Sequence, residues 1–270
     1  MRVAGTVSLV TGASAGIGAA LAERLAAAGS RVLVHGRDKE RTAAVADRAG
    51  GVPLLAELRE PAAVDRLAED ARAAYGRVDL VIANAGRGHC GPFDAMTDDE
   101  IDEVLAVDLA SAVRLTRRLL PDMVERGRGH LCYVTSVAGR TGVAGEAVYA
   151  AAKAGLDAFA ESLRLELSGS GIGVTVVVPA VVATDFFATR GRPYDRRSPR
   201  PVSAARVARA TVEAVEADRE EIFVPGWLRI APAVRAVAPT PYRALSRRFG
   251  EQVRSSGDAG GDTSRGAGGH

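Results

Sequence analysis

Cysteine, net charge and long apolar runs are all scarce in this chain of 270 residues. The two cysteines, Cys90 and Cys132, are too few for a disulfide framework. The net charge of +2 gives no general attraction to nucleic acid. No apolar run approaches the roughly 18 residues that span a membrane. Because the chain starts almost directly with an expected strand at 7–11 rather than a signal peptide, we expect a cytoplasmic protein.

Apolar segments with the lengths of strands and helices alternate from residue 7 to residue 178. Hydrophobic residues make up 47% of the chain, which is enough for a large core. Strands that alternate with helices are typical of a parallel sheet, so we predict an α/β fold. A capping-box pattern at Thr97 predicts the start of a long helix that ends near Arg126. The expected strands lie at 7–11, 31–35, 52–56, 78–83, 131–135, 173–178 and 221–224.

A glycine-rich turn follows the first expected strand and precedes a helical segment. Its glycines are Gly12, Gly16 and Gly18. Glycines let the backbone turn sharply and let a pyrophosphate approach the free N–H groups of a helix N-terminus. The G-x-x-x-G-x-G spacing differs from the common G-x-G-x-x-G, but the position between a strand and a helix favours nucleotide binding.

The end of the second strand indicates which cofactor binds. Enzymes that use NAD usually carry an acid there for the ribose 2′-hydroxyl, whereas this chain has Gly36 followed by Arg37. A guanidinium can pair with a 2′-phosphate, so we favour NADP(H) over NAD(H). The alternative is that Arg37 is a solvated surface charge. Asp38 is expected to cap the next helix.

Ser136, Tyr149 and Lys153 form the candidate catalytic group. Lys153 follows Tyr149 by four positions, so both side chains lie on one face of a helix. A phenol with a pKa of about 10 becomes an efficient base only if that pKa falls by about 3 units, or about 4 kcal/mol. One ammonium at about 4 Å supplies about 4 kcal/mol at an effective dielectric of about 20. Without other motifs, the same spacing is more often an exposed helix pair.

These motifs together resemble the short-chain dehydrogenase/reductase family over roughly residues 5–225. The resemblance implies a single Rossmann-type, doubly wound parallel sheet of about seven strands with helices on both faces. It implies Tyr149 as the general acid/base, Ser136 as the donor to the substrate oxygen, and Lys153 as the residue that lowers the tyrosine pKa. It further implies a cofactor site made of Thr11, Gly12, Ser14, Gly16, Ile17, Gly18, Arg37, Asn84, Ala85, Gly86, Tyr149, Lys153, Pro179 and Thr184.

Three positions depart from the family pattern. Asp108 stands where the family commonly has an asparagine that anchors a proton-relay water, and it brings a negative charge near Lys153. Ala180 replaces a glycine beside the nicotinamide, and Ala15 stands where some NADP-preferring members have an arginine. The main expectation is an NADP(H)-dependent oxidoreductase acting on a ketone or secondary alcohol. The alternatives are an NAD-dependent alcohol dehydrogenase and a non-catalytic cofactor-binding protein.

The last third of the chain sets the expected domain boundaries. Residues 1–225 are the predicted catalytic domain, 226–254 an extension packed near the substrate pocket or a subunit interface, and 255–270 a disordered tail. Phe186, Phe187 and Tyr194 lie in a proline- and arginine-rich loop and suggest an apolar substrate. We expect a homodimer or homotetramer, a small-molecule substrate, no nucleic acid and no metal. Contact of residues 226–250 with a membrane surface is the less favoured alternative to packing.

Overall fold

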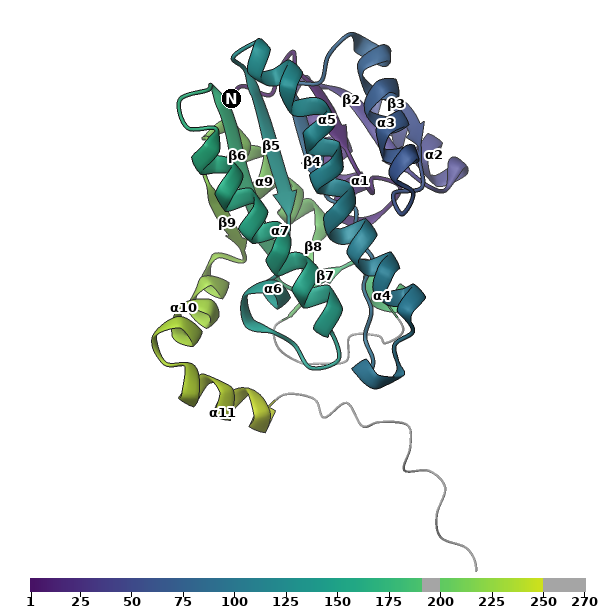
Figure 1. Cartoon of the computed structure of the whole chain (residues 1–270). Coiled ribbons are helices and arrows are strands. Elements are labelled where there is room, and N and C mark those ends of the chain that lie inside the picture. The colour runs from purple at the N-terminus through teal and green to yellow at the C-terminus, as the bar shows by residue number, and fades with distance from the viewer. Residues whose placement is uncertain (191–199, 250–270) are drawn as a thin grey trace, which may run out of the picture.

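The computed structural model describes residues 1–190 and 200–249 and contains a seven-stranded, fully parallel sheet. The strand order is β3-β2-β1-β4-β5-β6-β9, and β7 pairs with β8 in a small second sheet. Figure 1 shows the large sheet between two layers of helices. This confirms the predicted Rossmann-type fold. The strands are β1 (Val7–Val10), β2 (Arg31–Gly36), β3 (Val52–Leu55), β4 (Leu80–Ala83), β5 (Gly129–Val134), β6 (Ile172–Pro179), β7 (Val182–Ala183), β8 (Val202–Ser203) and β9 (Glu221–Val224).

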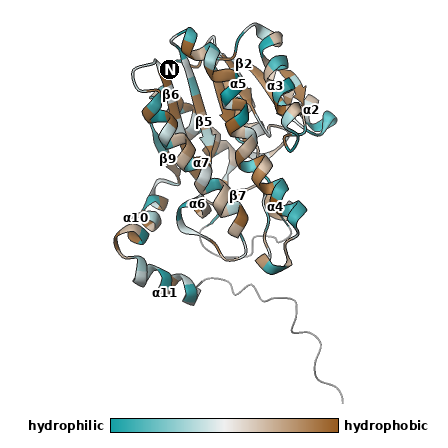
Figure 2. Ribbon diagram, viewed as in Figure 1, coloured by the Kyte–Doolittle hydropathy of each residue, from teal (hydrophilic) through white to brown (hydrophobic). Residues whose placement is uncertain are grey.

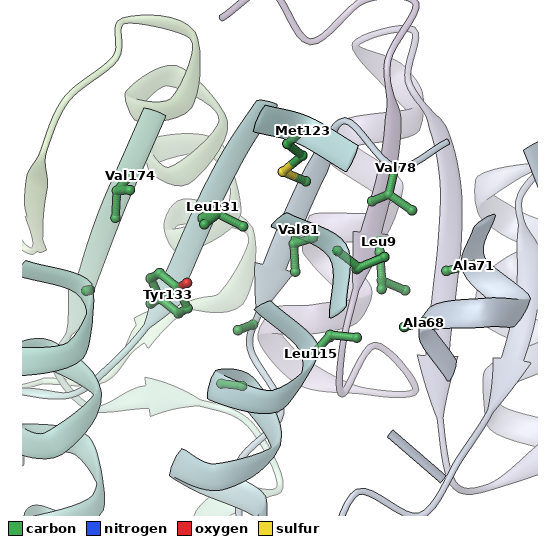
Figure 3. Close-up of a cluster of buried hydrophobic side chains, with 14 of the residues drawn as sticks. Leu9, Ala68, Ala71, Val78, Val81, Leu115, Met123, Leu131, Tyr133 and Val174 are labelled. Atoms are coloured by element: carbon green, nitrogen blue, oxygen red, sulfur yellow. The ribbon is translucent and has the colours of Figure 1, made fainter. Parts of the chain in front are cut away.

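The two helix layers bury separate apolar clusters. Helices α3, α5 and α7 cover one face of the sheet, and α1, α2 and α9 cover the other. Figure 3 shows Leu115 and Met123 of α5 against Val81 and Leu131 of the sheet; all four side chains are at most 1% exposed. The helices flanking the sheet are α1 (Gly16–Ala27), α2 (Lys39–Ala49), α3 (Pro61–Tyr75), α4 (Asp98–Leu105), α5 (Ser111–Glu125), α7 (Ala147–Glu166) and α9 (Ala204–Glu216).

The sheet reverses its winding between β1 and β4. The chain first moves outward from β1 to β3 and then crosses back to place β4 beside β1, with Val10 opposite Ile82. In open α/β sheets, ligands bind in the crevice at the carboxyl ends of the strands where the winding reverses. The glycine-rich turn after β1 and the Asn84 turn after β4 both lie at this position.

Two predicted helix caps are confirmed, and one predicted helix is interrupted. The Asp38 carboxylate accepts from the Arg41 amide at 2.9 Å, and Thr97 forms the expected capping box with Glu100. The long helix predicted from 97 to about 126 is instead split by one π-helical turn, η2 (Ala106–Ala110), which contains Asp108. Such π turns are often found at functional sites.

The region after β9 is helical, whereas the sequence predicts only one short helix there, near residues 242–250. It contains the 3₁₀ turn η3 (Gly226–Arg229), α10 (Ile230–Val237) and α11 (Pro239–Phe249). Helix α10 packs against α6 (Val137–Thr141), and α11 packs chiefly against α10. The predicted disordered tail at 255–270 and Tyr194 lie outside the described residues. Among the described helices, none is both long and apolar enough to cross a membrane.

Candidate active site

The glycine-rich turn leaves no room for side chains where it meets the β4 end. A Cβ on Gly12, whose φ is +62°, would lie 2.7 Å from Ala85 Cα. A Cβ on Gly18 would lie 2.2 Å from the Gly12 carbonyl oxygen and 2.7 Å from Asn84 Nδ2. The turn therefore requires glycine at both positions, one for the left-handed backbone and one for close packing.

Thr11 and Asn84 join the two turns by hydrogen bonds. Thr11 Oγ1 accepts from the backbone amides of Asn84 and Ala85 at 3.0 and 3.1 Å. Asn84 Nδ2 in turn donates to the carbonyl oxygens of Thr11 and Gly12 at 2.9 and 3.2 Å. These contacts fix the shape of the nucleotide-binding turn.

A pocket of about 900 Å³ opens in front of these turns, within the upper part of the range for ligand sites. Most of the predicted cofactor residues line it, whereas Thr11, Gly18 and Asp108 lie beneath its surface. Thr184, far away in sequence, reaches the glycine-rich turn, since a Cβ on Gly16 would lie 3.1 Å from Thr184 Cγ2. The predicted residues on the pocket wall are Gly12, Ser14, Gly16, Ile17, Arg37, Asn84, Ala85, Gly86, Ser136, Tyr149, Lys153, Pro179 and Thr184.

The predicted catalytic residues meet at one end of this pocket. Ser136 lies two residues after the end of β5 and caps α6, with its Oγ accepting from the Ala138 amide at 3.1 Å. Tyr149 and Lys153 lie on α7, and the ammonium is 5.7 Å from the centre of the tyrosine ring. Both side chains are buried, with Tyr149 8% and Lys153 3% exposed. The pair is therefore not an exposed helix pair.

The electrostatic surroundings of Tyr149 differ from the simple expectation that Lys153 alone sets its pKa. Burial raises the pKa of the phenol above its ordinary value, and the nearby Asp108 carboxylate raises it further. Contact with the Ser136 hydroxyl lowers it. In the protein without cofactor, the phenol is thus held in its protonated form.

Asp108 forms a buried ion pair with Lys153. Its Oδ1 lies 3.1 Å from Lys153 Nζ, and its Oδ2 accepts from the Arg87 amide at 2.7 Å. Lys153 Nζ also donates to the Val134 carbonyl at 3.3 Å. Burial raises the pKa of Asp108, while Lys153 and the Arg87 amide oppose that rise. The sequence predicted that Asp108 lies near Lys153. Asp108 belongs to the π turn η2, which places its carboxylate beside the ammonium.

The far end of the pocket carries Arg37 and Arg41 on its wall, next to Ser14. Arg37 Nη1 lies 3.3 Å from Glu57 and 3.9 Å from Glu103, and its side chain is 57% exposed. The pair with Glu57 is exposed on both sides, and such exposed pairs contribute little to stability. Arg41 was not predicted as a site residue. The only signal in the sequence is its position in the first helical turn after the Asp38 cap, which brings it back toward the loop between β2 and α2.

The pocket wall nearest the catalytic residues is largely apolar. Phe186 and Phe187 of α8 (Phe186–Thr189) line it, and the Phe186 ring centre lies 5.7 Å from that of Tyr149. The Arg190 guanidinium stacks on Phe187 at 4.4 Å and pairs with Glu146; the two charged side chains are 9% and 11% exposed. Glu146 and Arg190 were not predicted, because nothing local links residues so far apart in sequence.

His89 and Cys90 do not belong to a metal site within the described residues, which contain no group of three or more potential ligands. Cys90 lines the pocket, while His89 lies 3.8 Å from Glu100.

The family profile described as short chain dehydrogenase matches residues 6–195. The chain is 37% identical over 200 residues to the 3-oxoacyl-[acyl-carrier-protein] reductase FabG of Escherichia coli strain K12, a match that covers 73% of this chain and 81% of that protein. With its seven-stranded parallel sheet and nucleotide-binding turn, the chain belongs to the short-chain dehydrogenase/reductase family of oxidoreductases, which bind a nicotinamide cofactor.

Two solved structures of similar fold contain different cofactors. A metagenomic short-chain oxidoreductase in complex with NADP is 31% identical, with a TM-score of 0.71, and the alignment covers 83% of this chain and 97% of that one. A short chain dehydrogenase/reductase from Burkholderia phymatum in complex with NAD is 25% identical, with a TM-score of 0.78, covering 94% and 98%.

Proposed function

We propose that this protein is an NADP(H)-dependent oxidoreductase that interconverts a ketone and a secondary alcohol. The observation that carries the proposal is the meeting of Ser136, Tyr149 and Lys153 on the wall of a pocket that also contains the glycine-rich turn. Bound NADP(H) supplies or accepts the hydride. The fit of this cofactor is supported by the pocket of about 900 Å³ that the glycine-rich turn and the Asn84 turn both line.

In this proposal, Tyr149 moves the proton on the substrate oxygen and Ser136 donates a hydrogen bond to that oxygen. Lys153 supplies positive charge beside the phenol and, by family resemblance, holds the nicotinamide ribose. Asp108 offsets part of that charge, and its own carboxylate also raises the pKa of Tyr149. It serves as a positioning residue in place of the family's asparagine.

The cofactor preference rests on Arg37, with Arg41 as a second cation at the same end of the pocket. Their guanidinium groups suit a 2′-phosphate, and β2 ends in Gly36 rather than in a carboxylate, with Arg37 directly after it. The similar metagenomic oxidoreductase that was solved in complex with NADP favours the same choice. The Asp38 carboxylate on the pocket wall and the NAD-bound neighbour favour the second candidate, an NAD-dependent alcohol dehydrogenase.

The substrate is proposed to be apolar near its carbonyl. Phe186 and Phe187 supply an apolar wall, and the charge of Arg190 is already engaged by Glu146. A substrate carboxylate at this wall would have to compete with that ion pair. We further propose a homo-oligomer in the cytoplasm, built on α5 and α7, where Val124 and Leu165 are 46% and 70% exposed.

The cofactor assignment is tested by titrating the protein with NADPH and with NADH while following nucleotide fluorescence. We expect NADPH to bind at least about tenfold tighter, which corresponds to about 1.4 kcal/mol. Arg37→Ala should remove most of that preference by weakening NADPH alone. Arg48→Ala, which removes an exposed arginine paired with Glu23 outside the pocket, is the matched control. Equal or tighter binding of NADH would favour the NAD-dependent alternative, and binding of neither cofactor would favour a non-catalytic protein.

A further inference from the structure

Residues 226–249, which we call the C-terminal arm, concentrate positive charge. The arm has five arginines and no acidic residue, whereas the rest of the chain has 30 basic and 33 acidic side chains. Its overall charge is therefore opposite in sign to that of the remaining sequence. The arginines are Arg229, Arg235, Arg243, Arg247 and Arg248.

The same arm exposes large apolar side chains. Of the ten large hydrophobic residues that are exposed in the described part of the chain, five belong to the arm. Four of them follow one another at intervals of three or four residues through η3 and α10, so they share one side of the helix. Figure 2 shows brown and teal residues along α10. The exposed fractions are 55% for Trp227, 59% for Ile230, 44% for Val234, 87% for Val237 and 59% for Leu245.

The arm is anchored to the catalytic domain at its start and projects from it at its end. Leu228 is 5% exposed, and the Arg235 guanidinium bonds to the Arg140 carbonyl. Beside α10, an open hollow of about 610 Å³ is bordered by Phe223 of β9 together with Ile230 and Val237. In Figure 1, α11 extends away from the sheet, while α10 lies near α6. An occupant of this surface would therefore meet both apolar side chains and arginines.

The arm lies at the active-site end of the molecule but takes no part in the pocket. Helix α10 packs against α6, which begins directly after Ser136. None of the residues 226–249 that the structure describes is among those lining the 900 Å³ pocket. Because the arm contributes nothing to the pocket wall, its contact with a surface would leave the cofactor site in place.

We propose that the C-terminal arm docks the enzyme onto the surface of a bilayer that contains anionic lipids. Arginines attract lipid phosphates, while Trp227 and the aliphatic side chains enter the boundary between headgroups and acyl chains. A second copy of the arm is a poor occupant, because its arginines would face equal positive charge without any carboxylate to pair with. Nucleic acid would satisfy the arginines but leave Val237, 87% exposed, without an apolar partner.

Sedimentation of the full-length protein with vesicles tests the proposal. Vesicles of phosphatidylcholine alone are compared with vesicles that also contain phosphatidylglycerol. We expect binding only to the second kind, weakened by added salt. At about fivefold for each charge, the triple variant Arg229→Gln, Arg243→Gln, Arg247→Gln should weaken binding about a hundredfold. Trp227→Ser with Val237→Ser should also weaken it, by at least tenfold.

Phe93→Ser, which removes a 63% exposed side chain outside the arm, the pocket and helices α5 and α7, is the matched control and should bind like the unaltered protein. NADPH binding is also measured for each variant and should be unchanged, because the arm does not line the cofactor pocket. The proposal is overturned if the unaltered protein does not sediment with the phosphatidylglycerol vesicles, or if the arm variants bind as well as the control. If the protein does not bind vesicles and Val237→Ser also lowers the mass of the oligomer in light scattering, the proposal is overturned in favour of another role. The arm would then be a contact between subunits.

Discussion

Asp108→Asn should lower the pKa of the Tyr149 phenol. The variant keeps the shape of the side chain and an oxygen that can accept from the Arg87 amide, but it removes the charge that faces Lys153 at 3.1 Å. Tyr149 then lies beside an ammonium whose charge is no longer offset. Since Asp108 raises the pKa of the phenol in the unaltered protein, second only to burial, its loss acts in the downward direction.

The size of the effect follows from the distance between the ammonium and the ring. At 5.7 Å and an effective dielectric of about 20, one positive charge is worth about 3 kcal/mol, or about 2 pKa units. The carboxylate cancels part of this in the unaltered protein, so we expect a fall of about 1 to 2 units in Asp108→Asn. Oxidation of an alcohol, which needs the phenolate, should accordingly persist to lower pH in the variant.

The titration is read from the ultraviolet absorbance of phenolate. Subtracting the curve of the double variant Asp108→Asn, Tyr149→Phe isolates the signal of Tyr149 from the other tyrosines. Asp157→Asn is the matched control, because Asp157 is also a buried aspartate on an ion pair but is bound to Arg140 instead. A phenol pKa that is unchanged or raised in Asp108→Asn would refute the reasoning.

Two further predictions concern the glycine-rich turn. Burial lowers the pKa of His35 from 6.5 to about 4, and its Nδ1 accepts from the Gly12 amide at 3.3 Å. The unfolded chain therefore binds more protons than the folded protein between those pH values. The stabilising contribution is full above about pH 6.5 and falls as the pH drops toward 4, by up to about 3 kcal/mol. In urea unfolding, His35→Gln should lose less stability over this pH range than the unaltered protein, and an identical loss would contradict this. Gly18→Ala should weaken NADPH binding at least about tenfold because its Cβ would collide with the Gly12 carbonyl, while Gly226→Ala, whose Cβ meets open space, should bind normally in the same titration.

The sequence was sufficient for features that local patterns determine. The order of strands and helices follows from local apolar patterns, and the structure confirms it. The Asp38 cap and the Thr97 capping box each depend on residues within one helical turn, and the structure confirms both. The site end of the sheet was also predictable, since parallel strands bring the turns after β1 and β4 together. The motif from Ser136 to Lys153 was enough to predict that these side chains come together, and all of Ser136, Tyr149 and Lys153 line the pocket.

Features that depend on contacts between distant segments were not predictable. The π turn at Asp108 lies inside a segment whose apolar pattern is compatible with one continuous helix, so periodicity alone gave no sign of it. The pair between Glu146 and Arg190 depends on how α8 folds over the pocket. Helix α10 was missed because Pro232 lies inside it and argues against a helix, although Ile230, Val234 and Val237 have helical spacing.

The most direct test of the proposed function is steady-state oxidation of NADPH in the presence of apolar ketones, with Tyr149→Phe compared with Tyr133→Phe. Tyr133 is also buried but bonds to Thr116 at 2.9 Å, away from the pocket wall. We predict that Tyr149→Phe lowers kcat/KM by about 10² to 10⁴ with NADPH binding within about threefold of the unaltered protein, and that Tyr133→Phe retains turnover. Equal turnover in Tyr149→Phe and the unaltered protein would contradict the assignment of Tyr149 as the acid/base.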